Sequence, residues 1–184
     1  DVDPEQSLTL LVDVKTDGAK AWPRVLEQLE PLRERGWLSY VENDVVHTRQ
    51  VTVVGTGNTP FDVLMENRTY RDAFFDAPID EMWEDPDSDE VVTTPTKYNS
   101  TNSFYASVSL RATAGLGWYN PSKEKLRIIR GQIKGAHRRG LKARYWDTPA
   151  WPIQLRNKVW HLLEEQGIDM LNVDDLRAAS KKAW

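Results

Sequence analysis

Short apolar runs alternate along the chain with stretches of helical periodicity. The first run, residues 8–15, is nearly continuous and ends in charged residues, which is typical of a strand buried on both faces of a parallel sheet. Further runs predict strands at 51–54, 73–76, 103–110, 141–146 and 169–173. The connections between them are long enough for parallel pairing, so the sequence predicts an α/β fold.

Helical spacing predicts the intervening elements, at 22–35, 60–65, 122–139 and 152–167, with a short helix at the C-terminal end. Pro23 fits the first turn of the first helix, and Pro31 predicts a kink or break within it. Ser122 is a good N-cap for the third. A helix that begins near Ser107 is an alternative to the last part of the 103–110 strand.

Five or six strand–helix units can be counted, whereas a (β/α)8 barrel needs eight and takes roughly 250 residues. The 184 residues therefore predict one barrel domain that is short by two or three units. Polar side chains follow the ends of the predicted strands, at the edge that binds ligands in α/β folds. They are Asp13 and Lys15, Thr56 and Asn58, Asp76, Trp146 and Asp147, and Asn172 and Asp174.

The composition of the chain argues against several kinds of partner and site. The formal charge of -4 argues against nucleic acid as the main partner. The absence of cysteine excludes disulfides, thiolate zinc sites and cysteine nucleophiles. The three histidines, His47, His137 and His161, are not at ligand spacing, so surface or packing roles are expected for them. No segment approaches the roughly 20 apolar residues of a membrane span.

Two N-x-[ST] tripeptides lie in polar stretches and predict glycosylation at Asn67 and Asn99. They favour a secreted, extracellular glycoprotein. The chain starts at Asp1 rather than Met, which indicates processing or trimming. The acidic residues at 80–90 are expected to form a solvated loop.

Asp13-Val14-Lys15 is the most informative tripeptide. Residues i and i+2 of a strand point to the same side, so Asp13 and Lys15 are expected to project together. A carboxylate suits a hard cation such as Mg²⁺ or Ca²⁺, and an ammonium group suits a phosphate oxygen. A structural ion pair at the strand end is the alternative that spacing leaves open.

The later strand ends are equally ambiguous. Trp146 and Asp147 offer either an aromatic wall with an acceptor, or a packed tryptophan beside a turn-forming aspartate. Asn172 is placed to hydrogen-bond a ligand, whereas Asp174 or Asp175 could cap the terminal helix. Gly55-Thr56-Gly57-Asn58 is not a nucleotide-binding fingerprint, because it lacks the G-x-G-x-x-G spacing and a Walker lysine.

Four runs together resemble a known family: Leu11-Val12-Asp13-Val14-Lys15-Thr16-Asp17-Gly18, Val53-Val54-Gly55-Thr56-Gly57-Asn58, Ala143-Arg144-Tyr145-Trp146-Asp147-Thr148-Pro149 and Leu171-Asn172-Val173-Asp174-Asp175-Leu176. The resemblance is to the fungal altered inheritance of mitochondria protein 6 family. That family is similar to the PLC-like phosphodiesterases, TIM-barrel enzymes that include glycerophosphodiester phosphodiesterases and sphingomyelinase D.

The resemblance implies a mechanism in which two histidines act as general acid and base on a phosphodiester. A Glu-x-Asp pair and one further acid hold Mg²⁺ or Ca²⁺, and a lysine two residues after that acid contacts the phosphate. Asp13 matches the further metal acid and Lys15 the lysine, while Trp146 matches an aromatic residue at the barrel mouth. The resemblance thus implies catalytic roles for Lys15 and Trp146, and substrate binding by Asn58, Trp146, Asp147 and Asn172.

The departure from the family is at its first strands, whose His-rich motif and Glu-x-Asp pair have no counterpart here. Residues 1–184 thus resemble roughly the C-terminal five-eighths of the barrel. The expectation is a metal-dependent phosphodiesterase for a phospholipid head group or glycerophosphodiester. It would be active only with a second chain that carries the N-terminal strands, the two histidines and the Glu-x-Asp pair, as after cleavage of a precursor.

Two other functions remain open because fold does not fix function. A hydrolase or lyase that acts on a polysaccharide on the same scaffold would use the eight tryptophans for sugar stacking. A barrel without catalytic acids and bases would be a non-catalytic binding module.

Overall fold

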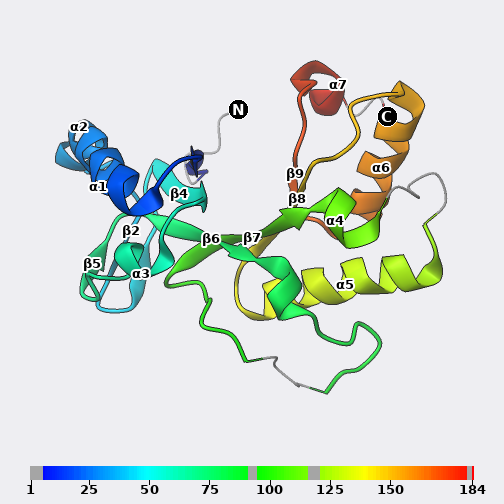
Figure 1. Ribbon diagram of the computed structural model, residues 1–184, viewed down its shortest axis with the longest axis horizontal. Helices are drawn as coiled ribbons and strands as arrows, with labels where there is room; N and C mark the ends of the chain where they lie inside the picture. The colour runs from blue at the N-terminus through cyan, green and yellow to red at the C-terminus, as the bar shows by residue number, and fades with distance from the viewer. Residues whose placement is uncertain (1–5, 91–94, 116–120, 182–183) are drawn as a thin grey trace. The chain divides into compact units, whose positions relative to one another are not determined.

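A computed structural model describes residues 6–90, 95–115, 121–181 and 184 of the chain. The chain divides into two compact units, residues 1–76 with 98–104 and residues 77–97 with 105–184. Both units combine parallel strands with helices (Figure 1). No helix among the described residues is both long and apolar enough to cross a bilayer.

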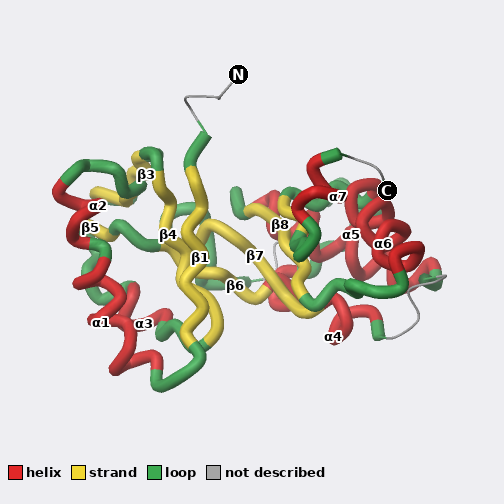
Figure 2. The backbone as a smooth tube through the Cα atoms, turned by 90° about the horizontal axis from the view of Figure 1, so that it is seen from above, coloured by secondary structure: helices red, strands yellow, loops and turns green. Residues whose placement is uncertain are grey.

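The main sheet of the first unit is parallel. Strand β1 (Leu8–Val14) pairs along its whole length with β4 (Val51–Gly57), and the two run side by side in Figure 2. The other side of β4 pairs with the start of β6 (Phe74–Pro78). All three were predicted as strands within a few residues of these bounds.

Helix α1 (Gly18–Gln28) begins a turn earlier than expected, because Asp17 caps it by accepting a hydrogen bond from the Lys20 backbone. Pro23 therefore lies inside α1, and its predicted place in the first turn is wrong. The predicted break is confirmed, because Pro31 lies at the beginning of a separate short helix, α2 (Glu30–Glu34).

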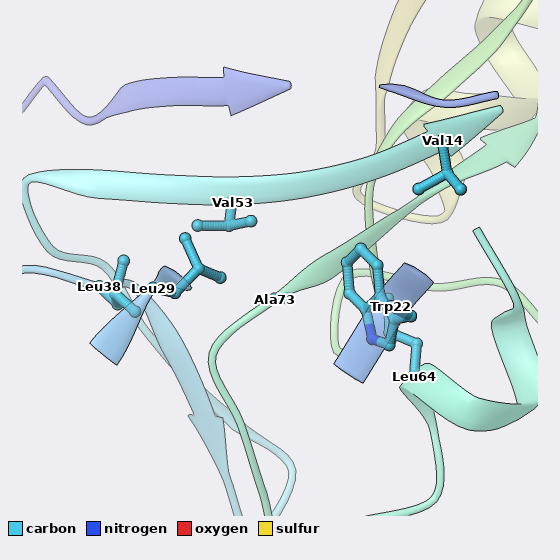
Figure 3. Close-up of a cluster of buried hydrophobic side chains, with 7 residues drawn as sticks. All are labelled: Val14, Trp22, Leu29, Leu38, Val53, Leu64 and Ala73. Atoms are coloured by element: carbon cyan, nitrogen blue, oxygen red, sulfur yellow. The ribbon is translucent and has the colours of Figure 1, made fainter. Parts of the chain in front are cut away.

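The core of this unit lies between the sheet and its helices. It contains Val14, Trp22, Leu29, Leu38, Val53, Leu64 and Ala73, and Figure 3 shows the labelled side chains on one side of β4. Leu64 comes from helix α3 (Phe61–Leu64). Gly55 makes room for Trp22, since a Cβ at position 55 would lie 2.9 Å from the indole ring.

Strand β1 is not buried on both faces, and that expectation is wrong for the described residues. The side chains of Leu8 and Leu10 are 69% and 39% exposed. The reason is that β1 is an end strand: it pairs with β4, and no other described strand pairs with it. An end strand with exposed leucines is a feature that folded proteins usually cover.

A small antiparallel sheet in the same unit was not predicted. It consists of β2 (Tyr40–Glu42), β3 (Val45–His47) and β5 (Tyr70–Arg71). The β2–β3 hairpin turns through Asn43 and Asp44, which both have positive φ, as a two-residue type I′ turn requires. His47 thus ends a strand, where its ring stacks on Tyr40.

The parallel strands of the second unit are β7 (Ser103–Ser109) from Tyr105 onwards, β8 (Lys142–Trp146) and β9 (Met170–Leu171). Its long helices are α5 (Lys123–Arg138), which lies beside β8 in Figure 1, and α6 (Ile153–Glu165). Ser122 caps α5, as predicted. Helix α4 (Leu110–Ala114) begins after its cap Ser109, and so not near Ser107.

The acidic stretch is only partly a solvated loop. Its first residues, 80–82, belong to a short 3₁₀ helix, η1 (Ile79–Met82). Glu84 is 3% exposed and accepts hydrogen bonds from Arg138 at 2.6 Å and from Arg139 at 2.9 Å. Glu84 is buried because two arginines neutralise its charge, which offsets the cost of desolvation.

The α/β class with parallel strands is confirmed. Three described strands in each unit follow one another in the parallel sense, which is compatible with part of a (β/α)8 barrel. Assignment of residues 1–184 to one barrel domain stays a prediction.

Candidate functional site

In the first unit, three polar residues lie in one row across the ends of the parallel strands. Asp13 of β1 is in register with Thr56 of β4. The β4–β6 register pairs Gly55 with Phe75, so the next residues, Thr56 and Asp76, are also opposite each other. Thr56 Oγ1 donates a hydrogen bond to Asp76 Oδ2 at 2.7 Å.

This row faces away from the helices. Val14 and Val53 point into the core that α1 and α3 cover, as Figure 3 shows. Because successive residues of a strand alternate in direction, Asp13 and Thr56 lie on the opposite face. In a (β/α)8 barrel the face opposite the helices is the interior, and active sites lie at the carboxyl ends of its strands.

The backbone beside this row of residues packs closely against the Asp13 side chain. Gly57 has a φ of 66°, and a Cβ there would lie 2.4 Å from Asp13 Oδ1, so no other residue fits without displacing this carboxylate. Asn58 follows, and its backbone N–H donates to Val14 O at 2.7 Å. Its side-chain amide donates to Thr16 O at 3.2 Å, so Asn58 ties the loops after β1 and β4 together.

Asp13 and Lys15 lie together, as their spacing predicts. Lys15 Nζ is 2.7 Å from Asp13 Oδ2, and the two side chains are 78% and 45% exposed. An ion pair this exposed contributes about 0–1 kcal/mol, because water screens it. Lys15 can therefore leave Asp13 for an anionic ligand at little cost, and the pair fits both the structural and the functional interpretation.

The row supplies oxygen donors suited to a hard cation, but too few for a complete site. Asp13 and Asp76 contribute carboxylates and Thr56 a hydroxyl, the ligand types that Mg²⁺ and Ca²⁺ prefer. Among the described residues, no group of three or more His, Cys, Asp and Glu side chains is placed to hold a metal ion. Asp13, Thr56 and Asp76 thus supply some, but not all, of the oxygen ligands that a complete Mg²⁺ or Ca²⁺ site needs.

In the second unit, Trp146 and Asp147 end β8. Trp146 is 45% exposed, so it is not the packed tryptophan of the alternative interpretation. Asp147 has a φ of 58°, which supports its turn-forming role. Its carboxylate accepts a hydrogen bond from Ser109 at 3.0 Å and pairs with Arg111 at 3.2 Å.

Asn172 follows β9 and contacts two residues of the β8 segment. Its Oδ1 accepts a 2.7 Å hydrogen bond from Arg144 Nη2, and its backbone carbonyl accepts one from Thr148 Oγ1 at 3.1 Å. Arg144 Nη1 also lies 3.4 Å from Ser107 Oγ on β7. These contacts place an arginine across all three strands of this unit.

Arg144 is on the face of its sheet that lies away from α5. The neighbouring Tyr145 is fully buried and donates a hydrogen bond to Gln132 of α5 at 2.6 Å. Burial raises the pKa of the Tyr145 hydroxyl. By strand alternation, Arg144 and Trp146 lie on the other face, the interior face of a barrel.

Sequence reasoning did not single out Arg144 or the Thr56–Asp76 contact. The signal for Arg144 was available: a charged residue stands between Ala143 and Tyr145, both of which are buried. A polar residue between two apolar or aromatic ones in a strand indicates the face that lies away from the packed side chains. The Thr56–Asp76 contact depends on strand register, which one sequence does not reveal.

Asp175 caps α7 (Leu176–Ser180), as one of the two interpretations proposed. Its Oδ1 accepts from the Ala178 backbone at 2.9 Å, and its Oδ2 accepts from Arg156 at 2.8 Å. The backbone hydrogen bond, followed by that from Arg156, lowers the pKa of this carboxyl group. His137 pairs with Asp169 and His161 with Glu165 at exposed positions on helices, which agrees with surface roles.

Both sequons are exposed and have the same local geometry. Asn67 Oδ1 accepts hydrogen bonds from the backbone and hydroxyl of Thr69, and Asn99 Oδ1 accepts the same pair from Thr101. The Nδ2 atom that would carry a glycan takes no part in these bonds.

Comparison with known proteins finds a matching family profile and similar fungal proteins. The sequence profile described as the AIM6-like phosphodiesterase domain matches residues 1–76. The altered inheritance of mitochondria protein 6 homolog of Arthroderma benhamiae is 38% identical over an alignment that covers 97% of this chain and 54% of that protein.

Altered inheritance of mitochondria protein 6 of Eremothecium gossypii is 34% identical, over 97% of this chain and 47% of its own length. The protein of that name in Saccharomyces cerevisiae (strain RM11-1a) is 29% identical, over 96% and 48%. The chain thus spans about half the length of the curated relatives it matches. No solved structure matches it.

Proposed function

The chain is a homologue of the fungal altered inheritance of mitochondria protein 6 family, and we propose that it forms part of a metal-dependent phosphodiesterase. The proposed substrate is a phospholipid head group or a glycerophosphodiester. The observation that carries the proposal is the row of Asp13, Thr56 and Asp76 beside Lys15. Asp13 and Lys15 lie within the segment that matches the phosphodiesterase domain.

Lys15 is proposed to bind a non-bridging oxygen of the phosphodiester. Its ammonium group is exposed and pairs with Asp13, so binding of phosphate exchanges one ion pair for another. As negative charge increases on the phosphoryl oxygens in the transition state, a cation fixed beside them stabilises that state more than the ground state.

Asp13 and Asp76 are proposed as ligands of Mg²⁺ or Ca²⁺, which would supply Lewis-acid stabilisation of the phosphoryl oxygens. Asp13 then serves two purposes, because it also holds Lys15 at 2.7 Å. The hydrogen bond from Thr56 orients the Asp76 carboxylate, as hydrogen bonds to metal-binding carboxylates commonly do.

The remaining donors and the acid–base pair are proposed to come from polypeptide outside these residues, a second chain or another part of the same protein. That part would bring the two histidines and the Glu-x-Asp pair of the family. The exposed leucines and open edge of β1 support this, because a parallel strand added there would cover them.

Substrate contacts are proposed for Trp146, Asp147, Asn172 and Asn58. Trp146 offers an exposed ring at the end of β8, and Asn172 offers amide N–H groups because its Oδ1 is occupied by Arg144. Asp147 accepts a hydrogen bond from Ser109 and pairs with Arg111, so besides its proposed substrate contact it would orient these two side chains. We also propose that the protein is secreted and glycosylated at Asn67 and Asn99.

The second candidate function is that of a hydrolase or lyase that acts on a polysaccharide. It is favoured by the exposure of Trp146 and Trp151, the latter 79% exposed, because such rings stack on sugars. Activity that survives EDTA on a phosphate-free substrate would select it over a phosphodiesterase.

The test uses Lys15→Met in the full protein, with Lys20→Met as its matched control. Lys20 also forms an exposed ion pair, at 3.3 Å from Asp17, but on α1. Lys15→Met is expected to lower turnover of bis(p-nitrophenyl) phosphate and glycerophosphocholine by about 100-fold, the usual cost of one transition-state charge donor. The control should leave it unchanged. Equal turnover by both variants on every phosphodiester tried would refute the proposal.

A further inference from the structure

A cavity of about 480 Å³ opens in the first unit near the amino end of β4. The segment that lines it is attached to this end of the strand, since Val51 N–H donates to Trp37 O at 2.9 Å and Leu38 bridges to Val51. The row with Thr56 lies at the carboxyl end of β4, about 16 Å away along the strand. The cavity is therefore separate from the proposed catalytic rim.

The cavity is both cationic and aromatic. Three arginines line it, Arg33, Arg35 and Arg49, together with the rings of Trp37, Tyr40 and Tyr70. None of the described residues that line it is acidic. A concave surface with this lining is suited to an anion that carries an organic group.

The positive charge of Arg33 is not available to a ligand in this cavity. It donates to Asp72, which is 5% exposed, and to Glu30, so its positive charge is matched within the fold. The hydrogen bond with Asp72 also raises the pKa of Arg33 above its ordinary value. Arg33 therefore has a structural role.

Arg35 and Arg49 supply the charge. The Cζ atom of Arg35 lies 5.4 Å from the Trp37 ring centroid, and that of Arg49 lies 5.7 Å from the Tyr40 centroid. No carboxylate in the described part of the chain forms an ion pair with either arginine. The Arg35 side chain donates a hydrogen bond to Pro31 O at 2.9 Å.

The aromatic wall fixes these guanidinium groups. A guanidinium held over a ring keeps its N–H donors in its own plane, where they can form paired hydrogen bonds to an oxyanion. Tyr40 is itself held, because His47 stacks on it at 4.6 Å and Tyr70 at 5.4 Å. Donors fixed in this way lose little conformational entropy when a ligand binds.

We propose that this cavity binds a phosphate-bearing ligand, as a second site distinct from the rim. Phosphate matches the arginine donors in charge and geometry, and the cavity volume lies within the range of small-molecule sites. The rings of Trp37 and Tyr70 are available to the organic part of the ligand. A soluble phosphate ester and a lipid head group share this chemistry, and the test distinguishes them.

The experiment compares the full protein with its Arg35→Gln/Arg49→Gln variant. A variant with Arg24→Gln and Arg177→Gln is the control, because it removes the same charge from exposed positions on α1 and α7. Calorimetry with inorganic phosphate and with glycerol 3-phosphate measures the soluble ligand. Sedimentation with vesicles of phosphatidylcholine containing 20 mol% phosphatidic acid measures the lipid.

Wild-type protein and the control are expected to bind at least one of these probes, and loss of both arginines should raise the dissociation constant by about tenfold or more. Phosphodiesterase turnover should be unchanged in the variant, which separates this result from a failure of the proposed function. If circular dichroism shows that the double variant is unfolded, Trp37→Ala, which removes the ring beneath Arg35, takes its place with the same expectation. No binding of any probe by wild-type protein, or an equal loss in the control, overturns the proposal.

Discussion

Thr56 Oγ1 donates a hydrogen bond to Asp76 Oδ2 at 2.7 Å, from the carboxyl end of β4 to the neighbouring strand β6. Asp76 is thereby held in the same row as Asp13, on the face of the sheet opposite the helices. Carboxylates that bind metal ions are commonly oriented by a hydrogen bond from a neighbouring side chain. A change to the Thr56–Asp76 contact should therefore change the affinity for the cation.

Thr56→Val is expected to weaken cation binding without abolishing the fold. Valine keeps the shape of threonine but cannot donate to Asp76, and loss of such a partner typically costs about 10–100-fold in metal affinity. The measurement is phosphodiesterase activity of the full protein against Mg²⁺ or Ca²⁺ concentration. The midpoint should rise at least about tenfold, whereas Thr56→Ser, which retains the hydroxyl, should stay near wild type. Identical midpoints for the two variants would show that the contact has no part in cation binding.

The strand ends were visible in the sequence because apolar runs stop there at polar residues. Asp13 and Lys15 could be identified as a pair because they are two residues apart on one strand. Asp76 and Arg144 could not be assigned partners, because strand register and the choice of neighbouring strands depend on tertiary packing.

The small sheet of β2, β3 and β5 was missed for a different reason. Its strands are two or three residues long, too short for a periodic pattern to stand out. The polar pair Asn43-Asp44 is a recognisable hairpin turn only once the flanking segments are known to be strands. The cationic cavity beside Tyr40 was therefore beyond sequence reasoning.

Asn172→Asp distinguishes a structural asparagine from one that binds substrate. The carboxylate still accepts the hydrogen bond from Arg144, so the melting temperature should not fall. The amide N–H donors are lost, and a negative charge faces an anionic substrate. KM for a phosphodiester should rise about tenfold, the equivalent of one lost hydrogen bond to a charged group.

Arg144→Lys is the partner experiment, since it keeps the charge but not the planar donor group that spans Ser107 and Asn172. Arg144→Lys should raise KM for the phosphodiester, and it should change kcat by a smaller factor than KM. If both substitutions leave KM unchanged, Asn172 is structural and its proposed substrate role is wrong.

Expression in a secretory host should add glycans at Asn67 and Asn99. Both asparagines are exposed and hold Oδ1 against the threonine two residues later, with Nδ2 outside these bonds. Mass spectrometry before and after peptide N-glycosidase is the measurement. Asn67→Gln and Asn99→Gln should each remove one glycan mass. A wild-type secreted protein with the unmodified peptide mass would contradict the sequon assignment.

Asp175 should make the stability of the second unit depend on pH. Its pKa in the folded protein is below the usual value because the Ala178 backbone N–H and Arg156 both stabilise the charged form. A depressed carboxyl pKa contributes stability that is fully present above the unfolded pKa, about 3.9, and is lost as the pH falls through the folded pKa.

Asp175→Asn should therefore lower the melting temperature at pH 7, and the difference from wild type should shrink as the pH is lowered below about 4. Asparagine can still cap α7, so the difference reports the charge and its pairing with Arg156 rather than the cap alone. Asp174→Asn is the matched control, since Asp174 is also exposed but caps no helix and should leave the melting temperature unchanged across this range. A constant difference between Asp175→Asn and wild type from pH 7 down to pH 2 would mean that ionisation of Asp175 does not stabilise the fold.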